Sequence, residues 1–242
     1  MSLPPLFQPL PWDTEFLGFG VARVAAAALP PAGWQQTQAA ARAAGFRLLY
    51  VVADPADTLT AQTLAAGGLA PISRLVTYLA EAATLTAPPN PLHIVPTARL
   101  TPELEALAWE SGAFSRFRLD PLMPATAFQR LYSEWLRKSL LGQELAREVF
   151  CARLGTGPEI GLLTLGVQQG RADIGLLAVA SGCRGQGVGH QLLAAAGART
   201  RAWGLSQVQV VTQFENQVAC RFYANAGFGV ACQQDVYHCW LL

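Results

Sequence analysis

The sequence has few charged residues and almost no lysine. Asp, Glu, Lys and Arg make up 14% of the 242 residues, and Lys138 is the only lysine. Basic and acidic side chains balance at 17 to 16, which gives a net charge of +1. This balance creates no field that attracts nucleic acid or an anionic membrane, so we expect neither partner. Apolar residues make up 52% of the chain, which excludes an intrinsically disordered protein.

Long apolar runs and paired cysteines are also missing. No stretch approaches the ~20 apolar residues that span a bilayer, and the start lacks the features of a secretory signal. We therefore expect no membrane span and a cytoplasmic location. The five cysteines are never spaced C-x-x-C, which argues against a disulfide framework or a zinc knuckle. Cys232, His238 and Cys239 lie near one another, but the last two should point to opposite faces of a strand, so we predict no metal site.

A proline-rich segment divides the chain. Residues 86–92, TAPPNPL, lack apolar periodicity and predict a linker or a long turn. We place a domain border there, between an N-terminal domain at 1–90 and a second domain at 91–242. The first domain has a β-α-β-α-β pattern, with strands expected at 20–28, 46–53 and 72–80 and helices at 34–44 and 57–67.

The second domain alternates strands and helices in a pattern that predicts an α/β architecture of the α+β type with a mixed sheet. The expected strands are 92–96, 147–154, 160–169, 172–180 and 206–213, the expected helices are 102–111, 125–141, 190–203 and 216–226, and a strand or hairpin closes the chain.

The two domains share a weak internal repeat. A shift of 159 residues aligns 39–79 with 198–238 without a gap and gives nine identities in 41 positions. Both copies are predicted to run helix, Gly, strand, helix, Gly, strand, with glycine where a left-handed helix cap is favoured. We interpret this as a distant duplication. The segment 25–30 has no counterpart to the glycines that precede the second copy, so the N-terminal half cannot bind the same ligand in the same way.

Those glycines form the densest motif of the sequence. The motif lies between a predicted strand and a predicted helix and consists of Arg184, Gly185, Gln186, Gly187, Val188 and Gly189. Glycines allow a diphosphate to approach closely, successive N–H groups bind anions, and the helix dipole adds positive potential. The motif therefore predicts a phosphate cradle, although a tight turn would explain one of the glycines. It lacks the lysine of a P-loop and the third glycine of a Rossmann fingerprint.

The cradle fits the pattern R-x-x-G-x-G, and a second pattern, N-x-x-A-x-x-x-Y-x-x-x-G-F, is matched from Asn216 to Phe228. With these two motifs the stretch 174–228 resembles the GNAT superfamily of acetyl-CoA-dependent N-acetyltransferases, and the element order from residue 93 fits the rest of that domain. The resemblance implies a GNAT fold with a central mixed, mostly antiparallel sheet, preceded here by a smaller half-GNAT-like domain. It implies acetyl-CoA as the acetyl donor.

Three shorter segments are similar to bacterial dTDP-fucosamine acetyltransferases: WDTEFLGF at 12–19, SRFRLDP at 115–121 and LSQVQVVTQ at 205–213. This resemblance implies that the acceptor is a nucleotide-linked amino sugar. Arg116 and Arg118 would hold its diphosphate and Phe117 would stack on its base or sugar, although a solvated charge pair explains the arginines equally well. A peptide, amino acid or antibiotic amine remains an alternative acceptor, and a CoA-binding module without turnover is an alternative function. The sequence leaves open whether the chain is a homodimer.

The GNAT resemblance also implies which residues hold the donor. The pantetheine arm would pair with the strand at Leu177, Ala178 and Val179, and the pyrophosphate would bind the amides of 184–189. His190 follows at the start of the helix, where it would touch a phosphate or simply be exposed. Asn216 would contact the donor or serve only as a helix N-cap.

Two further residues would carry the chemistry. Tyr223 resembles the general acid of the family, which implies that it protonates the departing thiolate. Its reference pKa of about 10 lies close enough to the value of about 8.5 for a thiol to make this donation feasible. Asp173, at the start of a predicted strand, would accept the proton of the amine. The alternatives are a core tyrosine, a surface aspartate and a water chain that serves as the base.

Overall fold

The computed structural model describes residues 6–24, 28–89, 92–142 and 145–241. The chain separates into two compact units. Unit 1 consists of residues 1–75, 119–124 and 233–242, and unit 2 consists of residues 76–118 and 125–232. The first border between the units lies at residues 75 and 76, before the predicted linker at 86–92, and residues 90 and 91 of that linker lie outside the described residues.

Unit 1 is a sheet in the order β1-β2-β3-β10. Its strands are β1 (Phe7–Pro9), β2 (Gly20–Val24), β3 (Phe46–Ala53) and β10 (Gly229–Trp240), and its helices are α1 (Pro11–Leu17), α2 (Pro31–Ala43) and α3 (Thr58–Ala66). β2 and β3 are parallel, whereas β1 and β10 each pair antiparallel with their neighbour. Trp34 of α2 and Leu64 of α3 pack on one face of the sheet and form its core with Leu49, Val51 and Tyr237.

The side chains of β10 alternate between the two faces of this sheet. Cys239 points toward α2, where the Gln38 amide donates to its sulfur at 3.4 Å. His238 lies on the opposite face, with Nδ1 2.6 Å from Oδ2 of Asp120, and the Trp240 indole N–H donates to the same oxygen. The prediction that His238 and Cys239 face apart is confirmed. The bonds of Asp120 also explain why residues 119–124 belong to unit 1.

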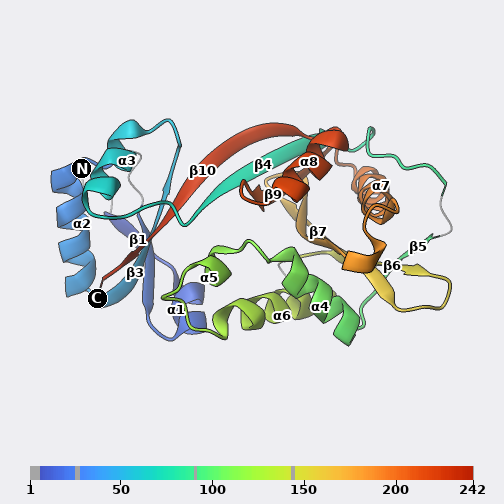
Figure 1. The fold of residues 1–242 in the computed structure, drawn as a ribbon, viewed down its shortest axis with the longest axis horizontal. Helices are drawn as coiled ribbons and strands as arrows, with labels where there is room; N and C mark the ends of the chain where they lie inside the picture. Colours follow the sequence, from blue (N-terminus) through green and yellow to red (C-terminus); the bar gives the residue numbers. More distant parts are fainter. Residues whose placement is uncertain (1–5, 25–27, 90–91, 143–144, 242) are drawn as a thin grey trace. The chain divides into compact units, whose positions relative to one another are not determined.

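Unit 2 contains the order β4-β9-β8-β7-β6-β5. These strands are β4 (Ser73–Glu81), β9 (Gln207–Gln213), β8 (Arg171–Val179), β7 (Glu159–Gln168), β6 (Glu148–Leu154) and β5 (Leu92–Pro96). β8 and β9 are parallel, and the pairs from β5 to β8 are antiparallel. Figure 1 shows α4 (Pro102–Ser111) and α6 (Ala127–Leu140) on one side of these strands and α7 (Val188–Ala202) and α8 (Gln217–Asn225) on the other.

The predicted repeat has the same element order in both copies, α2-β3-α3-β4 and α7-β9-α8-β10. Its four glycines, Gly45, Gly68, Gly204 and Gly227, all have the positive φ of a left-handed cap, as predicted. The last strands are exchanged between the copies: β10 pairs with β3 in unit 1, and β4 lies next to β9 in unit 2. Each copy therefore depends on the other for one strand of its sheet.

The predicted fold class, a mixed and mostly antiparallel sheet with helices, is confirmed. Several boundaries were wrong. β1, α1 and the short α5 (Arg116–Leu119) are missing from the prediction, because none is long enough to display a period. α7 begins at Val188 instead of His190 because Gly187 already provides its cap. The closing element is a strand, which is one of the two predicted alternatives. Within the described residues, no helix combines the length and the apolar content that a membrane crossing requires.

Candidate active site

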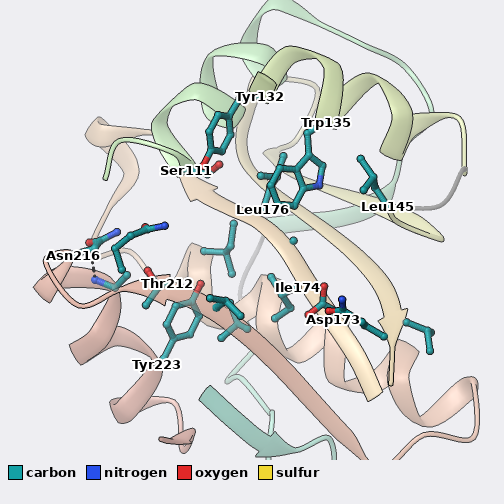
Figure 2. A pocket seen from close by; sticks show the side chains of 18 residues that line it. Ser111, Tyr132, Trp135, Leu145, Asp173, Ile174, Leu176, Thr212, Asn216 and Tyr223 are labelled. Atoms are coloured by element: carbon teal, nitrogen blue, oxygen red, sulfur yellow. Dashed lines mark hydrogen bonds between the residues drawn. The ribbon is translucent and has the colours of Figure 1, made fainter. Parts of the chain in front are cut away.

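A cavity of about 460 Å³ opens in unit 2 where β8 and β9 diverge. This volume is within the range of small-molecule sites. Figure 2 shows side chains of α6 above the cavity and Asp173, Asn216 and Tyr223 around its lower part. The lining comes from α4, α6, β7, β8, β9 and α8 and includes Ser111, Tyr132, Trp135, Leu145, Gln168, Leu176, Leu177, Thr212 and Gln213 as well as the three residues named above.

The cavity exists because two parallel strands stop pairing partway along their length. The register between β8 and β9 runs only from Ala172 with Val208 to Ile174 with Val210, although β8 continues to Val179. A bulge in β8 accompanies this divergence: the backbone N–H of Leu176 donates to the Thr164 hydroxyl at 2.8 Å. The end of β8, which includes the predicted residues Leu177, Ala178 and Val179, thus presents a strand edge that an extended ligand can pair with.

Asp173 lies near the start of β8, opposite Gln209 of β9 and Gly166 of β7. The Gln209 amide donates to Oδ1 of Asp173 at 2.9 Å. Burial raises the pKa of the Asp173 carboxyl above its ordinary value, and the hydrogen bond from Gln209 opposes part of that rise. A carboxyl with a raised pKa, in contact with a cavity, is suited to accept a proton from a bound ligand.

Tyr223 extends from α8 toward the same cavity and is 4% exposed (Figure 2). Its ring packs among the rings of Tyr78, Phe222 and Phe228, with centroids 5.3–5.8 Å away. Burial, with a smaller contribution from the neighbouring Cys220 thiol, raises the pKa of Tyr223. The hydroxyl therefore keeps its proton at neutral pH and is available as a donor.

Asn216 caps α8. Its Oδ1 accepts a hydrogen bond from the backbone N–H of Ala219 at 3.1 Å, which is the structural role considered for this residue. Asn216 also lines the cavity, so the cap and a ligand contact are compatible.

The predicted phosphate cradle is a loop that leads into α7. Gly185 and Gly187 have φ values of +76° and +81°, and Gly187 is the N-cap residue. By helix geometry, the first-turn amides of Val188, Gly189 and His190 have no acceptor within the helix, so they can bind an anion. The Val188 side chain is buried in the core, which leaves only its backbone for a ligand.

Several side chains of this loop already have structural contacts. A Cβ on Gly189 would lie 2.9 Å from the Phe222 ring, so this glycine allows α7 to pack against α8. His190 is exposed and meets the same ring edge-on at 5.2 Å. The Arg184 guanidinium donates to Glu110 of α4 at 2.8 Å and to the Val179 carbonyl at 3.0 Å. Gln186 donates to the Gly182 carbonyl at 3.2 Å.

The residues predicted to bind the acceptor lie on or beside α5 and do not belong to the lining of the cavity. Phe117 is 6% exposed, and the Arg116 guanidinium lies 5.0 Å from its ring centroid. Arg118 lies 5.4 Å from the ring centroid of Phe128. The two arginines contact aromatic rings in unit 2, and stacking of a ligand on Phe117 would require that this buried ring move.

Sequence reasoning missed most of the wall opposite β8. Tyr132 and Trp135 of α6 stack on each other with centroids 6.0 Å apart, and both line the cavity. A Cβ on Gly175 would lie 3.2 Å from the Trp135 indole nitrogen, so the glycine lets the indole lie against β8. In the sequence these residues have the spacing of core residues on an amphipathic helix, and no local signal distinguishes them from the core.

Residues 127–228, which include the cradle and every lining residue of the described cavity except Ser111, match the model of the acetyltransferase (GNAT) family. This part of the chain therefore has the sequence pattern of a GNAT acetyltransferase domain. The GNAT family catalyses acyl transfer and generally uses acetyl-CoA, and the predicted resemblance to this family is confirmed for residues 127–228. No curated protein sequence matches the chain.

Solved structures with the same fold span nearly the whole chain. A functionally unknown conserved protein from Staphylococcus epidermidis has a TM-score of 0.69 and 13% identity, with 98% of this chain and 93% of that protein covered. A tandem GNAT protein from the clavulanic acid biosynthesis pathway has a TM-score of 0.58 and 17% identity, with 92% and 75% covered. The glucosamine N-acetyltransferase region of a fungal multi-domain GH3 β-N-acetylglucosaminidase has a TM-score of 0.60 and 14% identity, with 96% and 31% covered.

Proposed function

We propose that this chain transfers an acetyl group from acetyl-CoA to the amine of a small molecule. The observation that carries the proposal is the meeting of Asp173 and Tyr223 at one cavity, where the parallel strands β8 and β9 diverge. The free edge of β8 suits the pantetheine amides of the donor. The glycine loop and the first turn of α7 suit its pyrophosphate.

The two residues divide the proton transfers between them. Asp173 accepts the proton of the attacking amine while the nitrogen bonds to the carbonyl carbon of the thioester. Tyr223 donates its proton to the sulfur as the carbon–sulfur bond breaks, so coenzyme A leaves as a neutral thiol. Burial raises the pKa of both groups, so the carboxyl is a stronger base and the phenol keeps its proton at neutral pH. The same shift makes the phenol a weaker acid, so its donation depends on the negative charge that develops on the departing sulfur.

We further propose that the acceptor is a nucleotide-linked amino sugar. The similarity of three sequence segments to the dTDP-fucosamine acetyltransferases supports this acceptor, and the fungal neighbour is an example of this fold in an enzyme named for glucosamine acetylation. Among the described residues, the cavity lining includes the carboxylate of Asp173 and no arginine or lysine. The amine therefore belongs in the cavity, and the diphosphate belongs outside it, at Arg116 or Arg118.

A thiol-release assay tests both levels of the proposal. Acetyl-CoA is offered with a dTDP-linked 4-amino-4,6-dideoxy sugar, the corresponding free sugar, an amino acid, a peptide and an aminoglycoside. We expect the nucleotide-linked sugar to react fastest, because its nucleotide contributes binding energy remote from the amine. Equal turnover of the free and linked sugars contradicts the acceptor assignment. Binding of CoA without turnover of any amine contradicts catalysis and favours a binding module.

A further inference from the structure

We propose that Gln209 is a positioning residue, whose amide holds the Asp173 carboxylate toward the cavity by bridging it to Gln168. The inference rests on the proposed function, in which Asp173 accepts the proton of the amine. Gln209 does not itself line the cavity, so it acts through Asp173.

The bridge joins three neighbouring strands. Nε2 of Gln209 on β9 donates to Oδ1 of Asp173 on β8 at 2.9 Å and to Oε1 of Gln168 on β7 at 3.3 Å. Gln209 is only 5% exposed, although its side chain is polar. An ionised carboxylate has no proton to donate, so the amide nitrogen must face Asp173, and its two hydrogens match the two acceptors.

A tight hairpin fixes the third member of the bridge. β7 and β8 are joined by Gln169 and Gly170, whose φ values are +51° and +77°, as in the turn that best matches the twist of paired strands. This turn sets Gln168 opposite Arg171 and brings Gly166 opposite Asp173. Gln169 is the one residue other than glycine with a positive φ among those that the structure describes. The register of β7 and β8 therefore requires an unfavourable backbone conformation at Gln169.

The bridge does two things for a base. It restricts rotation of the carboxylate, which keeps one oxygen directed to a fixed position. It also stabilises the ionised form, in opposition to the effect of burial. Among the residues that the structure describes, the ionisable groups on the adjoining elements include Arg171, which donates to Gln207 at 3.1 Å, and the phenols Tyr132 and Tyr223 of the cavity lining.

The neighbouring pair of side chains on β8 and β9, Arg171 and Gln207, supplies a control. Gln207 lies two residues before Gln209 on β9 and accepts a side-chain hydrogen bond from Arg171 of β8. Gln207→Leu therefore removes a cross-strand side-chain bond between the same two strands, together with the bond from Gln207 to Glu81 of β4, without removing any bond of Asp173. Gln209→Leu removes the bridge, and Gln209→Glu keeps its shape but places a second carboxylate beside Asp173.

The test combines a titration that needs no turnover with a kinetic measurement. Carboxyl carbon NMR of protein labelled at aspartate, with the Asp173 signal identified by its loss in Asp173→Asn, follows the ionisation of this group. We expect Gln209→Leu to move the midpoint to higher pH, Gln209→Glu to move it further by like-charge repulsion, and Gln207→Leu to leave it unchanged. The low-pH side of the kcat/KM profile, measured with the best amine of the thiol-release screen, should shift to higher pH in Gln209→Leu, further in Gln209→Glu, and not at all in Gln207→Leu.

At neutral pH, Gln209→Leu should lower kcat roughly 10- to 100-fold while the KM for acetyl-CoA stays constant, because a displaced base impairs the chemical step. A wild-type titration midpoint or a wild-type kcat in Gln209→Leu overturns the positioning role. Should Gln209→Leu fail to fold, Gln209→Glu decides the question by the same two readouts. Wild-type turnover by Asp173→Asn would instead overturn the base assigned in the proposed function, and with it the catalytic role of Gln209.

Discussion

The two copies of the internal repeat place different residues at one equivalent position. Tyr223 of α8 aligns with Leu64 of α3, and both side chains are buried, at 4% and 0% exposure. Both helices begin at an acidic or amide cap, Asp57 or Asn216, that accepts a hydrogen bond from the third residue after it. The architecture is shared, and the hydroxyl is present in only one copy. The comparison teaches that the fold needs a large buried side chain at position 64 or 223, whereas the proposed chemistry needs the phenol hydroxyl at position 223.

The first helix of each copy shows a second difference. α7 starts after Gly187, whose positive φ turns the first-turn amides toward the loop. α2 starts after Pro30 with Pro31 at its first position, and proline has no N–H to offer an anion. The N-terminal copy therefore lacks the two features to which we assign proton donation and anion binding in the C-terminal copy.

The largest expected effect is at the position where the copies differ. Tyr223→Phe keeps the buried ring and removes only the hydroxyl, so we expect kcat to fall roughly 10²- to 10⁴-fold. The affinity for acetyl-CoA, measured by calorimetry, should remain nearly constant because the hydroxyl acts in the transition state. A rate within twofold of wild type would assign Tyr223 to the core, as Leu64 is.

The equivalent truncation in the N-terminal copy should affect folding instead of chemistry. Leu64→Ala removes a fully buried side chain from the core of unit 1, and we expect a loss of about 2–5 kcal/mol in unfolding free energy. Urea unfolding measures the loss, and the rate of thiol release by the folded fraction should stay unchanged. A specific loss of kcat without loss of stability would contradict the division between the copies.

Two glycines with matched backbones test the cradle. Gly185 in the loop and Gly204 after α7 have φ values of +76° and +74°, and an added Cβ meets nothing within 4 Å at either position. Leucine at either position should cost similar backbone strain, about 1–2 kcal/mol. CoA at a hundredfold excess over its Kd should stabilise the wild type by about 2.7 kcal/mol.

The thermal shift with CoA should persist in Gly204→Leu and be lost in Gly185→Leu, because only the latter covers the predicted pyrophosphate site. An equal shift in both variants would place the pyrophosphate elsewhere.

The smallest effect concerns the helix cap. Asn216→Ala should cost about 1 kcal/mol of stability, since the N–H of Ala219 loses its acceptor. Asn216→Asp introduces the residue type that caps α3 and should retain the stability. If Asn216 serves only as a cap, Asn216→Asp will also keep its rate of thiol release. A rate loss in Asn216→Asp, with stability intact, would reveal a contact with the donor.

The sequence was sufficient to predict the repeated elements, because glycine caps and strand alternation act locally. Tyr223 and Asp173 were found through a motif and through the start of a strand, and both line one cavity. Gln209 could not be found in this way. It alternates with the buried Val208 and Val210, so its position predicts a solvent-facing side chain, whereas the bridge to Asp173 depends on the register of three strands. Trp135 was missed for the related reason that a cavity wall and a core have the same helical period.

The exchange of final strands has a consequence for synthesis of the chain. β3 needs β10 as its neighbour, and the contact between Gln38 and Cys239 closes a separation of 201 positions. At a translation rate of about 5–20 residues per second, the N-terminal sheet waits roughly 10–40 s for its last strand. During that time one edge of β3 exposes unpaired backbone groups beside an apolar surface. We therefore expect a ribosome-associated chaperone to bind the N-terminal half of this protein while the rest of the chain is being synthesised.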